Sequence, residues 1–130
     1  MTDADILELM GARFQFGGRG PEFFDCWGLV GECFRRAGKP APIYETPNTR
    51  EAIARYISGQ LDSCWKKVER TPGSAVVIRF PDPTGVTQLH VGYVLDDTYF
   101  LHASETAQCV ARERLSAYHR NIMGFYVYDG

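Results

Sequence analysis

The spacing of apolar residues changes once along this chain, and that change constrains the fold more than any other feature. Before Pro72-Gly73, apolar side chains recur at the three- and four-residue spacing of helices. After it, runs rich in Val, Ile, Tyr and Phe alternate with turn-forming residues, which predicts strands. We expect strands at residues 75–80, 89–95, 99–103, 108–112 and 122–128. Helices followed by a meander of strands indicate an α+β fold, with the helices packed on one face of an antiparallel sheet of about five strands.

The first and third predicted helices have recognisable starts. Thr2 and Asp5 have the spacing of a capping box, and Gly11 follows the last apolar residue of this short helix. Asn48 or Thr49 would cap the third helix.

The second predicted helix carries the most informative cysteine. Asp25 is a natural N-cap, Cys26 is the first helical residue, and Gly38 ends the helix. Its apolar stripe consists of Cys26, Val30, Cys33, Phe34 and Ala37. This stripe predicts that the helix packs against the sheet.

Composition excludes several classes of protein. The length of 130 residues suits one compact domain, residues 1–130. A net charge of −2 with scattered signs excludes the basic stripe of a nucleic-acid binder, and no apolar run approaches the length of a membrane span. The acidic start, residues 1–5, shows no secretory signal, so we expect synthesis in the cytoplasm.

The four cysteines stand far apart and form no C-x-x-C pair, which gives no support to a zinc knuckle or a redox dithiol. In a reducing cytoplasm we expect four free thiols rather than two disulfides.

The sequence allows two interpretations of Cys26, one catalytic and one structural. Unpaired N–H groups at a helix start favour an anion, and beside a histidine they lower a thiol pKa to about 3.5–7.5, which would make Cys26 a nucleophile. Free cysteines are also among the most buried residues, so Cys26 would equally suit a structural place like that of Cys33.

His90 and His102 lie in adjacent predicted strands, and the turn between them decides whether they meet. A two-residue turn would point His90 away from His102. A three-residue turn through Thr98 would pair Gly92 with His102 and make His90 its diagonal neighbour, close enough for the imidazoles to touch. Two separately satisfied histidines are the alternative.

A metal site is the competing chemistry. Zinc would accept Cys26 and the two histidines and keep one open position. A lone thiol that is not paired with a second cysteine is a weak signal for zinc, and we expect no metal and no cofactor. His119 stands in a polar segment and is expected to be exposed.

Four runs of residues carry a family resemblance: Phe16-Gly17-Gly18, Asp25-Cys26-Trp27-Gly28-Leu29-Val30, His90-Val91-Gly92-Tyr93 and Phe100-Leu101-His102-Ala103. In this order they resemble the NlpC-type cell-wall peptidases, which are papain-like cysteine peptidases, and the resemblance spans residues 14–130. It implies the papain-like NlpC-type fold, with Cys26 as nucleophile, His90 as base and His102 as the residue that orients His90. It also implies hydrolysis of γ-D-glutamyl–diamino-acid bonds in peptidoglycan stem peptides.

Three residues depart from the family pattern. Phe14 stands where a tyrosine is usual, Trp27 replaces a serine, and Ser74 replaces an aspartate. We expect Phe14 and Trp27 to contact the substrate, together with Asp25 and with Arg19, which could meet a substrate carboxylate.

The run at residues 25–30 is similar to that of tail-associated phage and prophage members of the family. This resemblance implies synthesis in a bacterial cytoplasm, delivery by a virion tail with phage tail proteins as partners, and action at the cell wall. One rival reading is a catalytically inactive tail-tip or assembly protein of the same fold. Another is a relative that acts on a non-wall amide or on a lipid acyl group.

Overall fold

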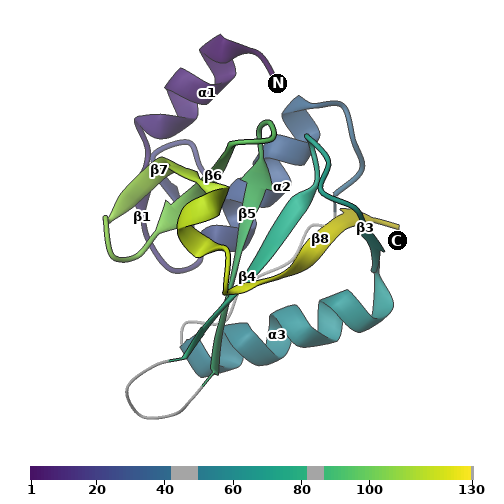
Figure 1. Cartoon of the computed structure of the whole chain (residues 1–130). Helices are drawn as coiled ribbons and strands as arrows, with labels where there is room; N and C mark the ends of the chain where they lie inside the picture. The colour runs from purple at the N-terminus through teal and green to yellow at the C-terminus, as the bar shows by residue number, and fades with distance from the viewer. Residues whose placement is uncertain (42–49, 82–86, 130) are drawn as a thin grey trace.

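The computed structural model describes residues 1–41, 50–81 and 87–129 (Figure 1). The helices are α1 (Asp3–Met10), α2 (Cys26–Arg36), α3 (Arg50–Ser63) and the 3-10 helix η1 (Leu115–Tyr118). The strands are β1 (Arg13–Phe14), β2 (Phe23–Phe24), β3 (Trp65–Val68), β4 (Ala75–Pro81), β5 (Thr87–Val94), β6 (Tyr99–Ser104), β7 (Cys109–Arg114) and β8 (Ile122–Tyr128). Among the described residues, no helix is long and apolar enough to cross a membrane.

The strands described here form one curled sheet in the order β2-β1-β7-β6-β5-β4-β8-β3. All neighbours are antiparallel except β1 and β2. The predicted α+β class is confirmed, and the five predicted strands correspond to β4–β8 within two residues at each end. The predicted number of about five is wrong, because eight strands are present in the described residues. The two-residue strands β1 and β2 are too short to show a period, and β3 is a short edge strand with two exposed lysines.

The helices begin as their capping residues predict. Thr2 Oγ1 accepts a hydrogen bond from Asp5 N at 3.1 Å, and Asp5 Oδ2 accepts one from Thr2 N at 3.0 Å, so the capping box is confirmed. Asp25 Oδ1 accepts from Gly28 N at 2.7 Å and caps α2. The cap predicted at residues 48–49 lies outside the described residues.

Two apolar cores lie on opposite faces of the sheet. The larger core joins the helices to one face and includes Leu9, Val30, Phe34, Ile57, Val91 and Leu101. The smaller core lies on the other face and consists of Val76, Ile78, Val94, Phe100 and Leu115. Helices α1, α2 and α3 thus share one face, as predicted, while η1 covers the other.

The β5–β6 hairpin sets the register of the two histidines. Tyr93 pairs with Leu101 and Val94 with Phe100, which is the register that a three-residue turn predicts. In the described residues, β5 pairs with β6 at these two positions only, whereas it pairs with β4 at seven. The two strands therefore separate beyond Tyr93, and β5 follows β4 away from β6 (Figure 1).

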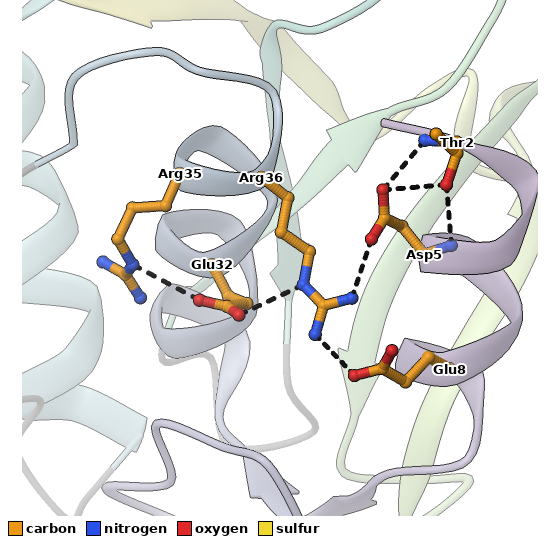
Figure 2. A network of polar contacts seen from close by, with 6 residues as sticks. All are labelled: Thr2, Asp5, Glu8, Glu32, Arg35 and Arg36. Carbon is orange, nitrogen blue, oxygen red and sulfur yellow. Dashed lines mark hydrogen bonds and ion pairs between the residues drawn. The ribbon is translucent and has the colours of Figure 1, made fainter.

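Arg36 joins α2 to α1 (Figure 2). Its guanidinium contacts Glu32 of its own helix at 3.1 Å, and Asp5 and Glu8 of α1 at 3.0 and 2.8 Å. The side chain is only 19% exposed. Neighbouring Arg35 makes a single ion pair with Glu32, at 3.3 Å, from a more exposed position.

We predict that Arg36→Met lowers the free energy of unfolding by about 1–2 kcal/mol, because three carboxylates lose their shared partner. Arg35→Met is the matched control and should cost less than about 0.5 kcal/mol. Urea unfolding of the two variants measures both values. Equal losses would show that the contact between α1 and α2 does not depend on Arg36.

Candidate active site

A cavity of about 550 Å³ lies where the start of α2 meets the separated ends of β5 and β6. Five of the seven residues singled out from the sequence line it: Phe14, Asp25, Cys26, His90 and His102. Trp27 and Arg19 are not among its lining residues. The structure thus brings the proposed nucleophile, base and orienting residue to one cavity.

Asp25 organises the start of α2. Its carboxylate is completely buried and accepts three hydrogen bonds. Oδ1 accepts from Gly28 N at 2.7 Å and from Arg19 Nη1 at 2.8 Å, and Oδ2 accepts from Gly17 N at 3.0 Å. One side chain therefore caps the helix and ties the preceding glycine-rich loop to it, which holds Cys26 in the first helical turn.

Close packing of that loop on the helix requires a glycine at position 28. A Cβ atom there would collide with the Gly18 carbonyl oxygen, which accepts a hydrogen bond from Asp25 N at 3.1 Å. Gly28 therefore keeps the loop close enough for its contacts with Asp25.

Cys26 is 5% exposed, and its thiol is protonated in the resting protein. Burial and, after it, the negative charge of Asp25 together raise the thiol pKa to about 12. The N–H groups of Val91, Trp27 and Cys26 itself act in the opposite direction. The expectation of a lowered pKa is therefore wrong, because burial outweighs the helix start.

The two histidines meet at the predicted diagonal. His90 Nε2 lies 2.7 Å from His102 Nδ1. His102 Nε2 lies 2.8 Å from Glu113 Oε1, and Glu113 Oε2 accepts from the Tyr118 hydroxyl at 2.8 Å. Glu113 was not predicted as a site residue, because the predicted strand stopped at residue 112. Its position could have indicated the contact: Glu113 lies two residues beyond Ala111, which is the partner of His102 in β7, and so on the same face of the sheet as His102.

The histidines and the body of α2 lie on opposite sides of the sheet. Val91 points into the core beneath the helices, and alternation along β5 places His90 on the other side. His102 stacks on Phe100 of the smaller core, with 4.8 Å between ring centroids. Both histidines still share a cavity with Cys26, because β5 and β6 separate at this point.

Both histidines are neutral at pH 7. Burial and, after it, the proximity of His102 together lower the pKa of His90 to about 3. Burial also lowers the pKa of His102, while the hydrogen bond and negative charge of Glu113 act in the opposite direction. In the resting site a neutral thiol and neutral imidazoles therefore line the same cavity.

Among the described residues, no three His, Cys, Asp or Glu side chains are arranged to share a metal ion. The contacts of His102 are instead to His90 on one ring nitrogen and to Glu113 on the other.

Three other residues named from the sequence are not among those that line the cavity. Trp27 is 1% exposed and packs on Trp65 in the core, with 5.3 Å between ring centroids. Arg19 forms an ion pair with Asp25 at 2.8 Å. Ser74 is buried and donates its hydroxyl to a backbone carbonyl three residues earlier.

The cavity has an aromatic wall, of which only Phe14 was predicted from the sequence. Phe14 and Phe16 meet edge to face, with 5.1 Å between their ring centroids. Phe80 and Tyr118 meet in the same way at 5.7 Å. All four line the cavity, but Phe80 and Tyr118 are far in sequence from Phe14 and Phe16 and from each other, so no local sequence pattern reveals the wall.

The chain belongs to the NlpC/P60 family, whose model matches residues 11–125. Members of this family are generally cysteine peptidases that act on peptidoglycan. The comparison with curated proteins finds no match.

Solved structures share the fold. A lipoprotein-like NLP/P60 family protein of Staphylococcus aureus superposes with a TM-score of 0.60 at 20% identity, over 95% of this chain and 38% of that one. NlpC2 of Trichomonas vaginalis gives 0.61 at 18% identity, over 94% and 43%. NlpC1 of the same organism gives 0.60 at 19% identity, over 94% and 42%. The chain thus spans about two fifths of the length of these proteins.

The raised pKa of Cys26 predicts slow alkylation of the resting protein. At pH 7, iodoacetamide should modify the half-buried Cys64 and Cys109 before Cys26, because Cys26 is buried and burial keeps its thiol protonated. Peptide mapping by mass spectrometry gives the order. Fastest modification of Cys26 would show that its thiolate already exists at rest.

The lowered pKa of His90 predicts acid sensitivity of the fold. Below the unfolded value of 6.5, the unfolded chain binds a proton at this position while the folded chain does not. Stability should therefore fall as the pH drops from 6.5 towards 3, by at most about 1.4 kcal/mol per pH unit from this group.

Urea unfolding at pH 7, 6 and 5 measures that slope. His90→Gln should flatten it, whereas the same replacement at exposed His119 should leave it unchanged. An unaltered slope in His90→Gln would mean that His90 is not held neutral by burial.

Proposed function

We propose that this chain is a cysteine peptidase that hydrolyses an amide bond in peptidoglycan stem peptides, at a γ-D-glutamyl–diamino-acid linkage. The observation that carries the proposal is one cavity lined by Cys26 at a helix start and by the hydrogen-bonded pair His90 and His102. Membership of the NlpC/P60 family supports the substrate class. The particular bond rests on the sequence resemblance.

The protonation states favour proton transfer during attack. Cys26 Sγ adds to the amide carbonyl carbon as its proton passes to His90 Nδ1, the ring nitrogen that His102 does not bind. The Cys26 backbone N–H, at the start of α2, is the donor proposed for the developing oxyanion. His102 holds the His90 ring in place throughout.

Two steps complete the reaction. The tetrahedral intermediate collapses to a thioester on Cys26 as the C–N bond breaks, and the His90 imidazolium gives its proton to the leaving amine. Water, deprotonated by His90, then adds to the thioester carbonyl, and the acid is released as Sγ regains its proton. These steps need no oxidant, metal or cofactor.

The aromatic wall provides apolar contact for the peptide. Phe14, Phe16 and Phe80 line the cavity together with three acidic residues, Asp25, Glu105 and Glu113. We propose Phe14 as a substrate contact. Asp25 and Arg19 act on the substrate indirectly in this proposal, through the loop that they hold.

We further propose that a phage or prophage tail delivers the chain to the cell wall. It rests on the run at residues 25–30 and takes phage tail proteins as partners, a bacterial cytoplasm as the place of synthesis and the cell wall as the place of action. Neighbouring tail genes would support it. Neighbouring genes without tail functions would count against it.

An inactive tail-tip or assembly protein of the same fold is the second candidate. Phe14 favours it, because this residue replaces a tyrosine usual in the family and offers no hydroxyl to the cavity. The protonated resting state of Cys26 is compatible with either candidate. Activity on purified wall material separates them.

Cys26→Ala should abolish the release of muropeptides from purified sacculi, because no other thiol lines the cavity. Cys64→Ala is the matched control and should keep the wild-type rate. Mass spectrometry of the released peptides measures both, and circular dichroism checks that the variants fold.

Undiminished release by folded Cys26→Ala would exclude thiol catalysis. If the wild-type chain releases no peptide from any sacculus type tested, the structural candidate is favoured.

A further inference from the structure

A chain of hydrogen bonds leads away from the cavity behind the two histidines. It runs from His90 to His102 at 2.7 Å, from His102 to Glu113 at 2.8 Å and from Glu113 to Tyr118 at 2.8 Å. The members come from β5, β6, β7 and η1, so the chain crosses four elements of the described fold. The histidine pair belongs to the proposed catalytic group, whereas Glu113 and Tyr118 have no part in that reaction.

The chemistry of each group fixes the direction of these bonds. An ionised carboxylate only accepts hydrogen bonds, so Glu113 requires a proton on Nε2 of His102 and on the Tyr118 hydroxyl. Burial and, after it, the hydrogen bond to Glu113 together raise the pKa of Tyr118 to about 12, which keeps this hydroxyl a donor.

The proton on His102 Nε2 in turn fixes the direction of the hydrogen bond between His102 and His90. Neutral His102 with its proton on Nε2 has a lone pair on Nδ1, which can only accept. His90 must therefore donate from Nε2, and this leaves the lone pair of neutral His90 on Nδ1. That lone pair is the one that the proposed reaction needs for the Cys26 proton.

The opposite arrangement would be inactive. If His102 carried its proton on Nδ1, it would donate to His90 Nε2. The His90 proton would then sit on Nδ1, and His90 could not take a proton from Cys26 there. The two arrangements satisfy the contact between the histidines equally, so only a group behind His102 can select between them.

From this geometry we infer that Glu113 is a positioning residue: it fixes the tautomers of His102 and His90 so that the lone pair of His90 Nδ1 is available for the Cys26 proton. Tyr118 anchors the second carboxylate oxygen of Glu113. The inference rests on the proposed function for its catalytic consequence, but the tautomers are a property of the resting protein. Glu113 is 35% exposed and His102 4%, so the acceptor stands at the rim and the ring that it orients is buried.

The wild-type protein provides the first test. Long-range 1H–15N correlation spectra of protein with 15N-labelled histidines distinguish a protonated ring nitrogen from an unprotonated one. At pH 7 both His90 and His102 should carry their protons on Nε2. A proton on Nδ1 of either ring would overturn the inference without any variant.

Two variants at position 113 distinguish the effect of the hydrogen-bond acceptor from the effect of the negative charge. Glu113→Met removes the acceptor at similar size, and it should mix the tautomers and lower kcat by about 10–100-fold with little change in KM. Glu113→Gln keeps one acceptor oxygen for His102, so it should keep the wild-type tautomers and a kcat within about 10-fold of wild type. Glu69→Met is the control at an exposed position and should leave spectra and kcat unchanged.

The outcomes distinguish this inference from the proposed function. Wild-type tautomers as inferred, with no peptide released from sacculi, would overturn the proposed function and leave the tautomer assignment standing. Release of peptides by a folded Glu113→Met at the wild-type rate, with unchanged tautomers, would overturn the inference alone. If Glu113→Met does not fold, the wild-type spectrum and the Glu113→Gln variant still decide.

Discussion

The buried carboxylate of Asp25 is the contact on which the rest of the site depends. It is completely buried and holds Gly17, Arg19 and Gly28 through three hydrogen bonds. A buried carboxylate without such donors would be costly, so the loop, the helix start and the arginine stabilise one another. Its charge has a second effect, since it adds to burial in keeping the thiol of Cys26 protonated. The residue that places the nucleophile thus also suppresses its thiolate at rest.

The separation of β5 from β6 supplies the other half of the site. A sheet paired along its full length would keep the face that carries His90 apart from the face beneath α2. Because pairing ends at Tyr93 and Leu101, the opening admits both the start of α2 and the histidine pair to one cavity. The resting site is then uncharged at Cys26, His90 and His102, and a substrate meets a base that is already deprotonated.

Sequence patterns predicted what local chemistry determines. The capping of α1 and α2 and the five long strands follow from capping residues and alternation, and the histidine register follows from turn length. The short strands β1 and β2 arise from tertiary pairing and have no pattern of their own. The wrong expectation for the Cys26 pKa has a physical cause too, because burial is a property of the whole fold and a helix start is local. Glu113 and the aromatic wall were missed since their partners lie on other strands.

Detection of a covalent intermediate on Cys26 would test the proposed thiol catalysis most directly. Wild-type protein is mixed with a γ-D-glutamyl-containing muropeptide, quenched in acid before the first turnover is complete, and measured by intact-protein mass spectrometry with peptide mapping. We predict a mass increase equal to the acyl part of the substrate, located on Cys26 and absent from Cys26→Ala. Product release in the same experiment, with every cysteine unmodified or with the acyl group on another residue, would contradict it.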